Sequence, residues 1–239
     1  MVIKKIKKIL LKAFAIGILI FTLIAPVKAM TGNTRILLDL AHSDTMYYSS
    51  DGQLIRDDGA TFGEYKEREL TNQITLKVKS ILEDSGIQVD LTRDFDESIT
   101  LEERVEKATK FNYDAYISLH ANSCKTPNTG TGYEAYSNNQ YNLSKNIVEE
   151  LSSTYGLPNR GIQATPYYNR LIQNSTLIEL GFINNDIDRD ILINRQDEVA
   201  QIIANNILKQ YKPKLESKTI DTKTIDTNCG SFNILINYK

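Results

Sequence analysis

The two histidines of this chain occupy equivalent places in the sequence pattern. His42 follows the apolar run Ile36–Ala41, and His120 follows Tyr116–Leu119. Both runs are typical of parallel strands, and open α/β sheets place their ligand sites at the carboxyl ends of such strands. A single histidine at a strand end is usually structural, but here the whole histidine content lies at two such ends. The pattern therefore predicts a shared site.

A third residue, Glu67, is spaced to join this site. Two imidazoles can bind zinc, and a catalytic zinc site adds a third protein ligand and keeps one position for water. Glu67, Ile74 and Ile81 are seven residues apart, so they share one helical face. A carboxylate at this place can instead complement the helix dipole, a role that Glu64 would fill equally well. The spacing by itself leaves both roles of Glu67 open.

Glu179 is the fourth candidate, because it interrupts the apolar run Thr176–Phe182. An ionised carboxylate is costly in apolar surroundings unless it is paired, hydrogen-bonded or exposed at a cleft. Burial would raise its pKa, as a residue that alternates between general base and general acid requires. The alternative is a carboxylate on the exposed side of an edge strand.

The elements that must position these residues alternate between short β-rich runs and helical patterns from Thr34 to Tyr211. This alternation predicts the α/β class, with parallel strands that are apolar on both faces. Strands are expected at residues 35–40, 87–92, 114–119 and 175–180, and helices at residues 70–82, 100–111, 141–155 and 199–207.

Composition and the ends of the chain suit one exported domain with appendages. Of 239 residues, 24% are charged and 41% apolar, which excludes a disordered or collagen-like chain. Residues 1–29 combine a lysine-rich start, a short apolar run and small final residues, as in a secretory signal peptide; an uncleaved membrane anchor is the alternative. The catalytic domain is expected at residues 30–212, and residues 213–239 as a polar linker with a short tail that forms one strand.

Charge and cysteine content restrict the partners and the compartment. Removing residues 1–29 removes six lysines and no acid, so the net charge changes from −2 to −8 and nucleic-acid binding is disfavoured. Cys124 and Cys229 are far apart and are free or paired. Export, the lack of a lipid-modification cysteine and abundant Asn, Ile, Lys and Tyr favour a secreted or cell-wall protein of a Gram-positive bacterium.

A series of short motifs occurs in one order along the chain. They are Asp39-Leu-Ala-His42, Gly59-Ala60 followed by Glu67, Leu91-Thr-Arg-Asp94 with Asp96, Leu101 with Arg104, Ile117-Ser-Leu-His-Ala-Asn122, Gly132-Tyr-Glu134, Asn159-Arg-Gly161 and Ile178-Glu-Leu-Gly-Phe-Ile-Asn184. Together they resemble the zinc-dependent N-acetylmuramoyl-L-alanine amidases of the Amidase_3 family, which are bacterial peptidoglycan hydrolases. The resemblance covers residues 34–211.

The resemblance implies a single catalytic domain with a mostly parallel, twisted central sheet flanked by helices on both faces. It implies that His42, Glu67 and His120 bind Zn²⁺ and that Glu179 is the catalytic carboxylate, acting as general base and acid on zinc-activated water. The implied reaction is hydrolysis of the amide between N-acetylmuramic acid and L-alanine. Peptidoglycan would then be the partner, and contact with a membrane would depend on an uncleaved N-terminal segment.

The chain departs from the family at the first ligand and after the second histidine. The family usually has Asp-Pro-Gly-His-Gly-Gly where this chain has Asp39-Leu-Ala-His-Ser-Asp44, so a stiffer turn is expected. The segment Ser43–Phe62 is longer than is usual in the family and is either a surface hairpin that lines the groove or an inert insertion. Residues 123–141 are too few for the blocking helix of some relatives, so the groove is expected to be open.

Two other functions remain compatible with these residues. A zinc peptidase that acts within the stem peptide would use the same fold and site. A non-catalytic wall-binding module would follow if the altered turn around His42 had abolished metal binding.

Overall fold

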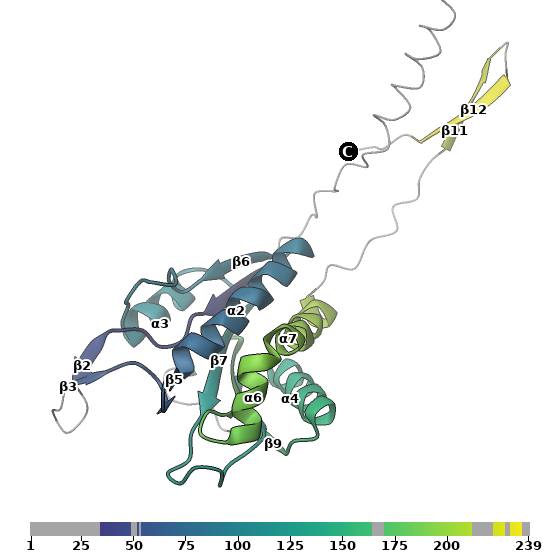
Figure 1. Ribbon diagram of the computed structural model, residues 1–239. Coiled ribbons are helices and arrows are strands. Elements are labelled where there is room, and N and C mark those ends of the chain that lie inside the picture. The colour runs from purple at the N-terminus through teal and green to yellow at the C-terminus, as the bar shows by residue number, and fades with distance from the viewer. Residues whose placement is uncertain are drawn as a thin grey trace, which may run out of the picture. The chain divides into compact units, whose positions relative to one another are not determined.

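The computed structural model describes residues 34–48, 52, 54–163, 170–211, 222–227 and 230–235 (Figure 1). The predicted signal segment, residues 1–29, lies outside the described residues, as does Cys229. Cys124 is a free thiol. No helix in the described part of the chain has the length and apolar character needed to cross a membrane.

A six-stranded sheet forms the centre of the fold. Its strands are β1 (Arg35–Asp39), β6 (Gln88–Leu91), β7 (Ala115–Asn122), β8 (Tyr133–Asn138), β9 (Asn159–Gln163) and β10 (Ser175–Phe182), in the order β6-β1-β7-β10-β8-β9. Only the β10–β8 pair is antiparallel. The predicted, mostly parallel sheet and its four predicted strands are therefore confirmed. β8 and β9 were missed because polar residues interrupt both strands, so neither has a strand-like apolar pattern.

Helices cover the two faces of the sheet. They are α2 (Glu67–Asp84), α3 (Leu101–Lys110), α4 (Tyr141–Tyr155), α6 (Asp186–Asn194) and α7 (Gln196–Tyr211). The larger apolar core joins α2, α4, α6 and α7 to one face, and these helices lie together in Figure 1. The smaller core joins α3 to the other face through residues such as Leu37, Ala108 and Tyr116. The predicted arrangement with helices on both faces is confirmed.

Successive residues of each strand alternate between these two faces. In β7, Ile117 and Leu119 belong to the larger core, whereas Tyr116 belongs to the smaller core on the α3 side. Ser118 and His120 therefore also face the α3 side. The alternation thus places polar side chains of β7 on one face without interrupting the core on the other.

The described part of the chain also contains three short hairpins. β2 (Met46–Tyr48) pairs with β3 (Leu54–Arg56), so the longer segment after His42 contains a hairpin. β4 (Thr61–Phe62) pairs with β5 (Tyr65–Lys66) immediately before α2. β11 (Thr222–Thr227) pairs with β12 (Gly230–Leu235), within the residues expected to form a polar linker and a short tail. β-Branched residues in Thr222–Thr227 suit a strand, and pairing satisfies backbone groups that a lone strand would leave open.

Candidate metal centre

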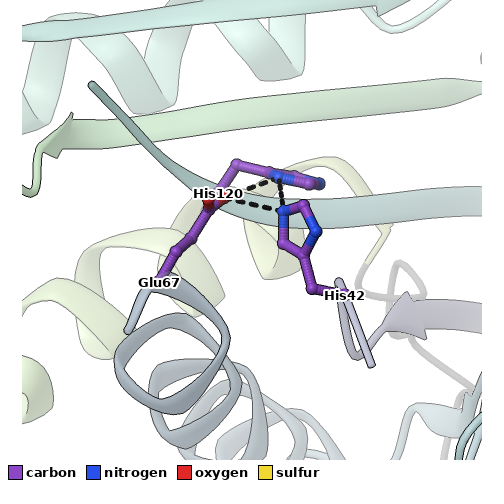
Figure 2. A group of neighbouring side chains, drawn as sticks. All are labelled: His42, Glu67 and His120. Atoms are coloured by element: carbon purple, nitrogen blue, oxygen red, sulfur yellow. Dashed lines mark hydrogen bonds and ion pairs between the residues drawn. The ribbon is translucent and has the colours of Figure 1, made fainter. Parts of the chain in front are cut away.

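His42, Glu67 and His120 meet at the carboxyl end of the sheet, each offering one ligand atom to the same point (Figure 2). Glu67 Oε1 lies 2.8 Å from His120 Nδ1 and 3.1 Å from His42 Nε2, and the two nitrogens are 3.2 Å apart. Ligand bonds of 2.0–2.1 Å around a tetrahedral ion place neighbouring ligand atoms about 3.3 Å apart. Small outward shifts of these side chains would therefore admit an ion.

The topology explains why residues so far apart in the chain converge. β1 and β7 are parallel neighbours with Asp39 opposite Ser118, so both histidines emerge at the same edge. Glu67 is the first residue of α2 and is 4% exposed, whereas Glu64 is exposed. The structure thus brings Glu67, and not Glu64, next to the two histidines.

Hydrogen bonds from two side chains stabilise the turn that carries His42. The resembling family usually has glycines in this turn. His42 has a φ of +57°, in the left-handed region that residues with a Cβ rarely adopt. The buried Arg93 donates from Nη2 to the His42 carbonyl at 2.6 Å and from Nε to the Leu40 carbonyl at 2.9 Å. Asn72 donates to the Ala41 carbonyl at 3.2 Å. These bonds oppose the strain and keep the imidazole directed at Glu67.

Gly59 allows the close approach of two of the three ligands. It has a φ of +72°, and a Cβ there would lie 2.6 Å from Glu67 Oε2 and 2.7 Å from His42 Cδ2. Its neighbour Ala60 donates its N–H to Glu67 Oε2 at 2.6 Å, and Ala121 donates its N–H to Oε1 at 3.0 Å. The carboxylate is consequently fixed by the backbone on both oxygens.

The outward nitrogen of His42 is held by a carboxylate. His42 Nδ1 lies 2.6 Å from Asp57 Oδ1, and Arg104 Nη2 donates to Asp57 Oδ2 at 2.7 Å. Arg104, on α3, is 4% exposed. Carboxylates that bind the second nitrogen of a ligating histidine fix its tautomer and orientation.

The Arg104 guanidinium is also connected to His120, through Asp39 and Ser118. Arg104 Nη1 lies 3.5 Å from Asp39 Oδ2, which accepts a hydrogen bond of 2.7 Å from Ser118 Oγ. Ser118 Oγ is in turn 2.9 Å from His120 Nε2. A continuous chain of polar contacts therefore joins the outward nitrogens of both imidazoles.

The charges of the three ligands depend on one another. Burial alone would raise the pKa of Glu67, but hydrogen bonds and charge interactions with both histidines lower it well below its usual value. Burial disfavours charged His42, yet hydrogen bonds to Asp57 and Glu67 raise its pKa to about 9. An ion bound at His42 Nε2 would therefore compete with a proton at neutral pH.

Glu179 lies beside the three ligands on β10. It is paired in register with His120 on β7 and with Glu134 on β8, so these side chains share one face. Glu179 Oε2 is buried and has no hydrogen-bond partner among the described residues. Burial, followed by the nearby charges of Glu67 and Glu134, raises its pKa to about 7, although His120 acts in the opposite direction. This direction matches the rise expected from its apolar run.

Comparison with known proteins identifies the fold and its activity. The sequence profile of Amidase_3, described as N-acetylmuramoyl-L-alanine amidase, matches residues 36–209, which is more than half of the chain. The chain belongs to this family. It is therefore an amidase, and the ordered motifs that indicated the resemblance lie within the matched region.

Two bacterial relatives and two solved structures show how far the similarity extends. The amidase domain is 31% identical to the uncharacterized protein YqiI of Bacillus subtilis, over 65% of this chain and 79% of that protein. It is 30% identical to the amidase LytC of the same organism, over 66% of this chain but only 34% of LytC. The amidase AmiC2 of Nostoc punctiforme superimposes with a TM-score of 0.65 and 29% identity, over 77% and 99% of the two chains. The CwlD amidase of Clostridioides difficile, solved with the GerS lipoprotein, gives 0.64 and 26%, over 76% and 100%.

Several residues of the amidase site were not assigned a role from sequence. Asp57, Arg104 and Ser118 support the histidines, and Glu134 adjoins Glu179. Arg104, Ser118 and Glu134 lie within the family motifs, but only the fold shows what they contact. Residues 123–140 contain β8 and no helix.

Proposed function

We propose that this amidase holds a zinc ion through His42, Glu67 and His120 and hydrolyses the bond between N-acetylmuramic acid and L-alanine in peptidoglycan. The observation that carries the proposal is the convergence of two imidazole nitrogens and one carboxylate oxygen within 3.2 Å of one another. Two nitrogens and one oxygen form a common donor set of catalytic zinc. A bound zinc ion would lower the pKa of a water ligand and polarise the scissile carbonyl.

Glu179 is proposed as the proton carrier of the reaction. Its pKa of about 7 suits a group that accepts a proton from water and then returns it to the departing amine of L-alanine. No described residue forms a hydrogen bond with Oε2, so no such bond competes with the proton at this oxygen. Without the return of the proton, the amine would be a poor leaving group.

We propose that the enzyme acts outside the cytoplasm, in or near the cell wall. The lysine-rich start, apolar run and small residues of residues 1–29 support this location, as does the net charge of −8 without them. The relative from Staphylococcus saprophyticus that is named a probable cell wall amidase is 31% identical over 57% of this chain. A secreted protein of a Gram-positive bacterium fits these features.

Mass spectrometry of muropeptides tests the reaction. Purified residues 30–212 are incubated with cell-wall fragments, with and without a chelator. We expect peptides that begin with free L-alanine, and none after chelation. Cleavage within the stem peptide would instead establish the zinc peptidase. A protein that binds walls, cleaves nothing and holds less than one zinc per chain would establish the binding module.

Asp57→Asn should weaken metal binding without changing any ligand. The substitution removes the negative charge that His42 Nδ1 contacts, and it leaves Arg104 with Asp39 as its one remaining carboxylate partner among the described residues. We therefore expect zinc affinity to fall about 10- to 100-fold. Competition with a chromophoric chelator measures this change. Asp44→Asn is the matched control, because Asp44 pairs with Arg68 in the same segment. Equal affinities for Asp57→Asn and the wild type would contradict the role of Asp57.

A further inference from the structure

A row of titratable side chains crosses the sheet, starting at the metal ligand His120. His120 on β7, Glu179 on β10 and Glu134 on β8 are direct neighbours in register. Strands in a sheet lie 4.7–4.9 Å apart, so the backbones at His120 and Glu134 are separated by about 10 Å. The sheet face that carries Glu179 therefore extends to β8 and β9. A second part of the substrate can bind there, about 10 Å from His120.

Arg160 of β9 ends this row and is held in place by two contacts. Its Nε donates to Glu134 Oε2 at 3.1 Å, and its guanidinium lies 4.9 Å from the centre of the Phe182 ring. Glu134 is 5% exposed, and its other oxygen accepts a hydrogen bond of 2.7 Å from Asn122. Contacts with buried groups therefore fix the Nε side of the Arg160 guanidinium in position.

The outer part of this guanidinium is free to bind a ligand. The Arg160 side chain is 39% exposed, although Glu134 beneath it is buried. In the described part of the chain, Nη1 and Nη2 make no hydrogen bond, and the only bond of the guanidinium uses Nε. A planar guanidinium with two free amino groups matches a carboxylate in a bidentate pair.

The substrate of the proposed reaction restricts what this cation can recognise. N-acetylated sugars are uncharged, and the lactyl carboxyl group of muramic acid is consumed in the scissile amide. The peptide beyond L-alanine carries carboxylates, the first being the α-carboxylate of D-isoglutamate. Extended peptide advances about 3.3–3.6 Å per residue, so two residues beyond a scissile bond held beside Glu179 cover about 7 Å. This exceeds the single strand spacing of 4.7–4.9 Å between Glu179 and Glu134, whose carboxylate contacts Arg160.

We propose that Arg160 is a specificity-determining residue that binds the free α-carboxylate of D-isoglutamate in the stem peptide. The inference rests on the proposed amidase reaction and adds a peptide subsite to it. Glu134 and Phe182 position the guanidinium, and its outer edge pairs with the substrate. The enzyme would therefore discriminate against stem peptides in which this carboxylate is amidated.

The test uses two soluble muropeptides that differ only in whether the D-isoglutamate carboxylate is free or amidated. We expect the wild type to favour the free acid about 10- to 100-fold in kcat/KM, mainly through KM, the range expected for a hydrogen bond to a charged group. Arg160→Gln should abolish this ratio by slowing the free acid, with the amidated substrate changed less than about twofold. Arg160→Lys, which retains a cation beside Glu134, should give an intermediate ratio.

Arg35→Gln is the matched control. Arg35 also pairs with a carboxylate, Asp90, and stacks 4.9 Å from the Phe111 ring, but it lies at the opposite end of β1 from the site. Its variant should keep the wild-type ratio.

The possible results separate failure of the inference from failure of the proposed function. Equal kcat/KM on both substrates for the wild type would overturn the Arg160 subsite while the amidase reaction stood, even if every variant misfolded. A wild type that cleaves neither substrate would refute the reaction itself. An Arg160→Gln defect confined to walls that retain phosphate polymers would show that the anion is phosphate, which also overturns the subsite.

Discussion

Glu179→Gln should bind one metal ion as tightly as the wild type and cleave soluble muropeptides about 10²- to 10⁴-fold more slowly. The carboxamide cannot accept and return a proton, but it keeps the size of the side chain beside His120 and Glu134. The loss should appear in kcat, because proton transfer belongs to the chemical step. Steady-state kinetics and metal analysis on the same preparation measure both quantities.

The pH dependence of the free energy of unfolding of the metal-free protein gives an independent test of the raised pKa of Glu179. The folded state raises the pKa of Glu179 from 4.5 to about 7, so between these values the folded state binds more protons than the unfolded state. Stability is therefore lost as the pH rises through this range, by at most ~3 kcal/mol. Glu179→Gln removes this loss, so the variant should gain stability over the wild type at pH 8 but not at pH 4.

Denaturant unfolding in the presence of a chelator, at both pH values, measures the difference between the two proteins. The comparison largely cancels the titration of His42 and Glu67, which both proteins share. Glu179 would lose its proposed role if Glu179→Gln hydrolysed muropeptides at the wild-type rate. A stability difference that did not depend on pH would have the same consequence.

His120→Ala should abolish both metal binding and activity. The substitution removes one of three ligand atoms and also takes away the imidazole that lies 2.8 Å from the buried Glu67 carboxylate. We expect a loss of zinc affinity greater than the roughly 10- to 100-fold typical of residues that only support a ligand. Chelator competition and hydrolysis of soluble muropeptides measure the two losses.

Ser118→Ala is the graded control for His120→Ala. Ser118 contacts His120 Nε2, the nitrogen directed away from Glu67, so its loss should lower zinc affinity by less than removal of the imidazole. Circular dichroism checks that both variants are folded. If His120→Ala still held one zinc per chain with wild-type affinity, the proposed ligand set would be wrong.

The sequence by itself determined the fold class and the four residues proposed for the site. Both histidines follow apolar runs that form buried parallel strands, and Glu67 heads the face of a helix whose apolar stripe packs on the sheet. These features are local, because strand and helix periodicities repeat over a few residues. The same local rules missed β9, whose five residues, Asn159–Gln163, include one apolar side chain.

The tertiary structure alone decided how these residues are supported and what adjoins them. Asp57 contacts Arg104 across 47 residues of sequence, and Asp39 contacts Ser118 across 79. Arg160 meets Glu134 because β8 and β9 are neighbours in a sheet whose strand order differs from chain order. Such contacts depend on the packing of whole elements, and the spacing of residues along the chain carries no direct record of that packing.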